Sequence, residues 1–157
     1  MDLTKQPPRS ARETFAGVMM APRTTDKCRA YLAGTLGAYI YNCPLDQKLF
    51  AFLGTNAEEF ADVVRRARGD DDVEAFVRQR VAGRSRDEIE TWNRDFLKYE
   101  PDLSRPAYRD AVEALQRRAP GRPDITLWVH LIDIEEGRPV PTPEEVRALK
   151  AELGLAA

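Results

Sequence analysis

The residues best suited to chemistry lie between Pro22 and Gly54, a segment that holds both cysteines of the chain. Cys43 directly precedes Pro44, and proline is favoured at the first position of a helix. This order predicts that Cys43 caps a helix, where unpaired N–H groups and the helix dipole favour a thiolate. Cys43 is therefore the candidate catalytic residue. The alternative is a small buried thiol that fills space beside apolar neighbours.

Polar residues flank this cysteine and form a candidate ligand-binding site. Arg23 and Lys27 lie four residues apart, so they would share one face of a helix that begins early enough to include both. Near a helix start, these two cations would bind a small anion such as a carboxylate or phosphate. Asn42 and Asp46 flank the Cys-Pro step, and each could hydrogen-bond a ligand or cap the helix. The alternative for the two cations is ion pairing with Asp26 and Asp46.

Two helices must position these groups. The first is expected over about residues 25–33, with Thr24 or Thr25 as its cap, and the second begins after Cys43. Small and aromatic residues alternate between them, which favours an extended segment and one small hairpin near Tyr39–Tyr41. Glycines at 34 and 37 would turn the chain and bring the two helix starts together around a shared polar pocket.

Apolar residues at helical spacing continue through the rest of the chain, with short breaks between the runs. Three of the runs open with a capping pattern: Asn56 with Glu59, Ser85 with Glu88, and Thr142 with Glu145. We expect an all-α fold of seven or eight short helices in a single compact domain over residues 1–157. Adjacent prolines at 7 and 8 disfavour a helix there, so residues 1–13 are expected to form an extended arm.

Composition excludes several functional classes. The 157 residues are 43% hydrophobic and 32% charged, as in a soluble globular protein. Residues 1–56 hold seven basic and four acidic residues, an excess too small to indicate nucleic-acid binding. No apolar run is long enough for a membrane helix, and the first residues do not resemble a secretory signal, which predicts a cytoplasmic protein. One histidine and two distant cysteines match no zinc motif, so neither a metal nor a cofactor is expected.

Four segments make the chain resemble a known family. They are DLTKQPPRSARE at 2–13, PRTTDKCRAYLAGTLGAYIYNCPLDQ at 22–47, FLG at 52–54 and APGRPDITLWVHLIDIEEGR at 119–138. The family is a bacterial domain of unknown function, DUF5069, and its most distinctive block surrounds Lys27, Arg29, Gly34, Tyr39 and Cys43–Asp46. The resemblance implies a bacterial cytoplasmic protein, supports a single domain and carries over no catalytic residue.

Two functions stay open at this point. The one we favour is a non-enzymatic helical module that binds a protein partner or a small anionic ligand through residues 22–54, with a homodimer as one form. It is favoured because no set of residues matches a known catalytic motif. The other is a small-molecule enzyme or thiol-dependent redox protein that uses Cys43, with Lys27 or Arg23 holding an anionic substrate.

Overall fold

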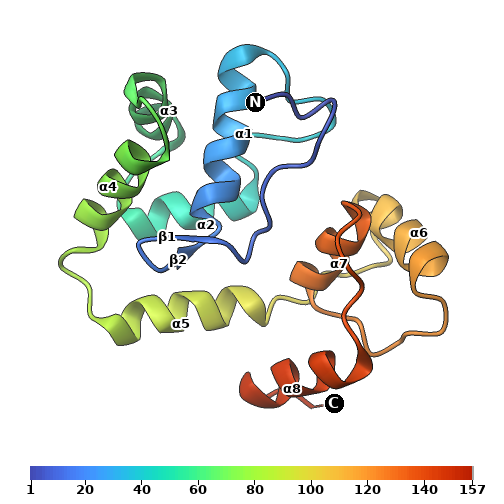
Figure 1. Cartoon of the computed structure of the whole chain (residues 1–157). Coiled ribbons are helices and arrows are strands. Elements are labelled where there is room, and N and C mark those ends of the chain that lie inside the picture. The colour runs from blue at the N-terminus through green and yellow to red at the C-terminus, as the bar shows by residue number, and fades with distance from the viewer. Residues whose placement is uncertain (157) are drawn as a thin grey trace. The chain divides into compact units, whose positions relative to one another are not determined.

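A computed structural model describes residues 1–156, which are mostly helical (Figure 1). This part of the chain contains eight α-helices, one short 3-10 helix and one two-stranded hairpin. The α-helices are α1 (Ala21–Ala33), α2 (Pro44–Leu53), α3 (Ala57–Arg66), α4 (Asp70–Val81), α5 (Arg86–Leu97), α6 (Arg109–Arg118), α7 (Trp128–Glu135) and α8 (Pro143–Glu152). The expected all-α class with seven or eight short helices is confirmed. None of the helices within residues 1–156 is long and apolar enough to cross a bilayer.

The chain divides into two compact units, residues 1–90 and the residues from 91 onward. In the first unit α1 packs against α3, while α2, α3 and α4 contact one another. Their apolar faces enclose a core that includes Phe50 and Phe60, whose ring centroids are 5.3 Å apart. In the second unit α6 packs against α7, around buried side chains such as Leu131 and Ile134.

The small hairpin lies at a different place from the one expected. Strand β1 (Thr14–Phe15) pairs antiparallel with β2 (Val18–Met19), next to the start of α1. Residues 38–42 contain turns and no strand, so the prediction of a hairpin near Tyr39–Tyr41 is wrong. The physical reason is backbone direction: Gly37 and Asn42 have left-handed φ angles of 61° and 66°, which interrupt an extended path.

Helix α1 begins a full turn earlier than expected. Its cap is Met20, with a left-handed φ of 77°, and Pro22 lies in its first turn. Proline is tolerated there because the first N–H groups of a helix have no partner within the helix. The prediction that Thr24 or Thr25 caps this helix is therefore wrong, and both threonines lie inside it. The expected start of α2, by contrast, is confirmed, with Cys43 as the cap.

Residues 1–13 contain no helix or strand, and the first of them lie against the α1–α2 connection, where the Thr35 hydroxyl donates to the Met1 carbonyl oxygen at 2.7 Å. The N–H of Leu3 donates to the carbonyl oxygen of Thr35 at 3.0 Å, and the Leu3 side chain is buried. Gly37 permits this approach, because a Cβ atom there would lie 3.3 Å from the Leu3 carbonyl oxygen. The first residues of the chain are thereby held against the connection that leads from α1 to Asn42 and Cys43.

Candidate functional site

The first half of α1 is polar yet buried. Five consecutive residues, Arg23 to Lys27, are each at most 4% exposed. A polar helix surface normally faces water, so each of these side chains needs a partner inside the protein. The start of α2 supplies partners on one side of the helix, and the N-terminal segment supplies them on another.

Lys27 and Asp46 form a buried ion pair between α1 and α2. The Lys27 ammonium donates to Asp46 Oδ2 at 2.7 Å, to the Ile40 carbonyl oxygen at 3.1 Å and to Cys43 Sγ at 3.4 Å. These contacts match the three hydrogens of an ammonium group. Asp46 also accepts hydrogen bonds from the Thr24 hydroxyl at 2.7 Å and from the Cys43 N–H at 3.2 Å. The hydrogen-bonding groups of both charged side chains are thus occupied by partners within the protein.

The predicted site residues divide into three environments. Lys27, Cys43 and Asp46 come together, and the Cys43 side chain is half-buried beside the ammonium. Arg23 is buried as well, but it donates to the carbonyl oxygen of Arg9 at 3.2 Å, and its guanidinium lies 5.7 Å from the Tyr39 ring centre. Asn42 is exposed, outside the buried pair.

A second ionic cluster holds the N-terminal segment and was missed by sequence reasoning. Arg9 donates to Asp26 through its backbone N–H and through its guanidinium, at 2.9 to 3.0 Å, and also reaches Asp70 at 2.8 Å. Arg29 donates to the other oxygen of Asp70 at 2.8 Å. Burial alone would raise the pKa of Asp70, but the hydrogen bonds from Arg9 and Arg29 lower it below its usual value. No local pattern signals contacts between residues so distant in sequence.

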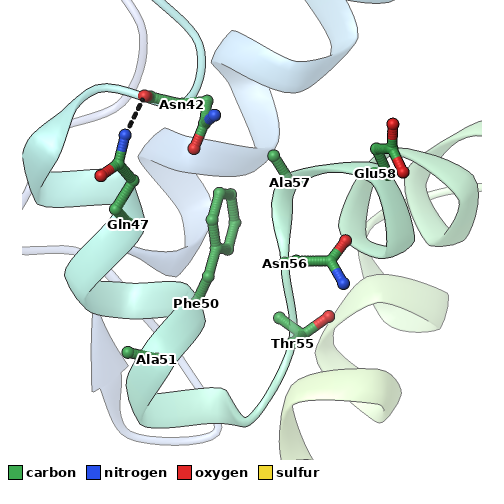
Figure 2. Close-up of a pocket in the computed structure, with 8 residues that line it drawn as sticks. All are labelled: Asn42, Gln47, Phe50, Ala51, Thr55, Asn56, Ala57 and Glu58. Atoms are coloured by element: carbon green, nitrogen blue, oxygen red, sulfur yellow. Dashed lines mark hydrogen bonds between the residues drawn. The ribbon is translucent and has the colours of Figure 1, made fainter.

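An open hollow lies beside α2 and the start of α3, with a volume of about 400 Å³ (Figure 2). The Phe50 ring points from α2 toward Asn42, and the Gln47 side-chain amide donates to the Asn42 carbonyl oxygen at 3.0 Å. The hollow is lined by both polar and apolar side chains. The lining residues are Asn42, Gln47, Phe50, Ala51, Thr55, Asn56, Ala57 and Glu58.

A second hollow of about 570 Å³ shares Asn42, Ala57 and Glu58 with the first, so the two adjoin. Its further lining residues are Tyr31, Tyr41, Ala61, Asp62 and Arg65. We call the two hollows together the Asn42 groove. Tyr31 and Tyr41 stack with their ring centres 5.0 Å apart. Burial raises the pKa of Tyr41, so its hydroxyl keeps the proton that it donates to the Ala57 carbonyl oxygen at 2.6 Å.

Free hydrogen-bonding groups are found in the Asn42 groove. Within residues 1–156, the side-chain amide of Asn42 and the carboxylate of Glu58 bond to no other residue. Asn42 adopts its left-handed conformation at little cost, because asparagine tolerates this region better than most residues. Sequence reasoning identified Asn42 but missed the rest of the groove, whose residues show no motif and meet only through the packing of α1, α2 and α3.

Comparison with known proteins places the chain in a family. A family model described as "Domain of unknown function (DUF5069)" matches residues 5–138. The chain belongs to this family. The DUF5069 match includes the buried Lys27–Asp46 pair and the whole Asn42 groove. No curated protein matches the chain.

The DUF5069 description assigns no activity. Within residues 1–156, no group of three or more His, Cys, Asp or Glu residues could hold a metal ion. The first unit therefore contains a buried ion pair, Lys27–Asp46, whose charges neutralise each other. On its surface lies the Asn42 groove, which has free polar groups.

Proposed function

We propose that this protein is a non-enzymatic binding module, and that the Asn42 groove binds an extended peptide segment of a partner protein. The observation that carries the proposal is the free Asn42 amide and Glu58 carboxylate in an open groove made of two adjoining hollows, of about 400 and 570 Å³. Clefts of several hundred Å³ with a few placed polar groups are typical of binding sites.

The chemistry of the groove suits a peptide. An extended peptide carries one N–H and one C=O per residue, and these must be satisfied when water is displaced. Side-chain amides provide both donors and acceptors, and the groove has three of them, at Asn42, Gln47 and Asn56. Gln47 donates to the Asn42 carbonyl oxygen and the Asn56 oxygen caps α3, so within residues 1–156 the Asn42 amide is the one that is free. Apolar side chains of the peptide would contact Phe50 and the alanines that line the groove.

The state of the predicted anion site supports binding over catalysis. Lys27 would have to leave Asp46 before it could hold an anionic substrate, and both side chains are at most 5% exposed. A buried ion pair of this kind resists separation, because an unpaired charge in the interior is strongly unfavourable. We therefore infer that Lys27 and Asp46 position the loop that carries Asn42.

A thiol-dependent enzyme is the second candidate, and one contact favours it. Cys43 is half-buried at the start of α2, and its sulfur lies 3.4 Å from the Lys27 ammonium, the cation that this hypothesis places beside the thiol. The reactivity of this thiol separates the two functions.

A peptide-display library tests the proposed function. Selection on the wild-type chain should enrich peptides that no longer bind an Ala57→Arg variant, because the long side chain would fill the groove. Ala75→Arg is the matched control, since Ala75 is an exposed alanine on α4 of the same unit. If no enriched peptide discriminates between these two variants, the groove is not a peptide site.

We further propose a bacterial origin and a cytoplasmic location. The family resemblance supports the first, and two unpaired cysteines suit the reducing cytoplasm. A homodimer also stays a prediction. Sedimentation equilibrium of the full chain would show it as a doubling of the measured mass at high protein concentration.

A further inference from the structure

We infer that the part of the Asn42 groove lined by Tyr31 and Tyr41 selects a basic side chain, so that the bound segment carries arginine or lysine there. This inference rests on the proposed function and adds the chemistry of the partner to it. Three features carry it. They are an exposed aromatic surface, the unpaired carboxylate of Glu58 beside it, and an ion pair between Asp62 and Arg65, the other two charged residues that line this hollow.

The aromatic surface comes from two stacked tyrosines. Tyr31 is 53% exposed in the last turn of α1, so part of its ring is open to a ligand. Its ring packs on Tyr41 with an angle of 28° between the ring planes. Tyr41 is fixed in turn by its hydrogen bond to the Ala57 carbonyl oxygen. The face of an aromatic ring carries partial negative charge and attracts a cation, above all a guanidinium.

The charges of the hollow favour a cation as well. Glu58, Asp62 and Arg65 line it, and the Arg65 guanidinium pairs with the Asp62 carboxylate three residues earlier on α3. This pair leaves Glu58 as the unpaired charge, and the three groups together carry a net charge of −1. A peptide cation over the tyrosines would pair with Glu58, whereas an anion would meet its carboxylate.

Direct titration of the full-length chain tests this inference. The probes are N-acetylarginine amide and its neutral isostere N-acetylcitrulline amide, followed by chemical-shift changes in the ¹⁵N-labelled protein. We expect the arginine probe to shift the amides of residues 31, 41 and 58 and to bind more tightly than the citrulline probe. Equal binding of the two probes, or shifts confined to other residues, would overturn the inference.

Two pairs of variants separate the cation site from general damage. Tyr31→Leu should weaken arginine binding about two- to fivefold, whereas Tyr31→Phe keeps the ring and should bind like the wild type. Glu58→Gln should weaken binding by a similar factor of about two to five. Its control is Glu144→Gln, because Glu144 is the second residue of α8, as Glu58 is of α3, and has the same relation to the helix dipole. Equal losses of arginine affinity in Glu58→Gln and Glu144→Gln would contradict a specific contact between Glu58 and the arginine side chain.

The peptide selection distinguishes failure of this inference from failure of the proposed function. Groove-dependent peptides that lack a recurrent basic residue would retain the peptide site and overturn its preference for a cation. Arginine binding that depends on Tyr31, without any groove-dependent peptide, would retain the cation site and overturn the peptide function. A recurrent arginine or lysine in the groove-dependent peptides would support both.

Discussion

At the scale of single residues, the Lys27–Asp46 pair has a structural role that its residue types alone do not reveal. Burying two charges is unfavourable, and their mutual attraction compensates only when the remaining hydrogen-bonding groups are satisfied. Here the partners come from Thr24 on α1, from the Ile40 carbonyl oxygen and from Cys43 at the start of α2. The pair therefore fixes the loop between the two helices, and with it the position of Asn42.

Removing one charge of this pair should destabilise the first unit strongly. Asp46→Asn keeps groups that can hydrogen-bond Thr24 and Cys43, but it leaves the Lys27 ammonium buried without a counter-charge. We expect a loss of about 3–5 kcal/mol in the free energy of unfolding, measured by urea denaturation. Glu90→Gln, which breaks the exposed Arg86–Glu90 pair, should cost less than about 1 kcal/mol. Similar losses in the two variants would contradict the structural role of the buried pair.

The two cysteines should differ sharply in reactivity. Cys28 is fully buried, and burial raises the pKa of its thiol to about 11, so both access and ionisation protect it. Cys43 is half-buried at the start of α2. Iodoacetamide should therefore label only Cys43 in the folded chain, and a folded Cys43→Ser variant should stay unlabelled. Labelling of Cys43 faster than of the unfolded chain would favour the thiol enzyme, and slower labelling would favour the binding module.

At the scale of elements, α2 and α1 differ in how well their first residues can be predicted from the local sequence. The start of α2 is predictable because Cys43, Pro44 and Asp46 act within one turn, and their spacing is visible in the sequence. The start of α1 is not, because Met20 caps it through a left-handed backbone and without a side-chain hydrogen bond. Asn42 was a candidate ligand residue because it flanks the Cys-Pro step, but the groove around it depends on helix packing.

Asp46 was among the expected ion-pair partners of the α1 cations and does pair with Lys27, but the partners of Arg9 and Arg29 were unpredictable for a related reason. Arg9 and Asp70 are 61 residues apart in sequence, and only the arrangement of the N-terminal segment, α1 and α4 brings them together. Sequence rules for charge pairs work within one helix, where residues three or four apart are neighbours. They correctly exclude Arg29 from the face of Lys27, and Arg29 does pair elsewhere, with Asp70 at the start of α4.

This second cluster predicts a pH dependence of stability. Arg9 and Arg29 hold the pKa of Asp70 below its unfolded value of about 3.9, so the unfolded chain binds the proton first as the pH falls. The stabilisation is fully present above the unfolded pKa and is lost as the pH falls through the folded pKa. Asp70→Asn should therefore lower the melting temperature near neutral pH, and its difference from the wild type should shrink in acid.

Asp71→Asn is the control for this pH effect. Asp71 is an exposed residue in the first turn of the same helix, so the substitution changes the helix charge by the same amount and leaves the arginines of the cluster in place. Circular dichroism melts of the two variants at several pH values provide the comparison. A difference between Asp70→Asn and the wild type that is independent of pH would contradict the linkage.

At the scale of the whole molecule, the question is whether the two compact units behave as the single domain expected from sequence. Both tryptophans, Trp92 and Trp128, lie in the second unit, and Trp128 packs edge-on against Phe96 there. Cys28 lies in the first unit. Tryptophan fluorescence and protection of the Cys28 thiol therefore report on different units of the unmodified chain.

We predict a single cooperative transition, because α5 runs without a break across the boundary after Glu90 and a continuous helix couples the segments that it joins. Fluorescence and Cys28 protection should then give the same urea midpoint. Asp46→Asn, although it lies in the first unit, should lower the fluorescence midpoint as much as the thiol midpoint. If this variant shifts only the thiol signal, the units unfold independently, the chain has two domains, and the DUF5069 match at residues 5–138 spans the boundary between them.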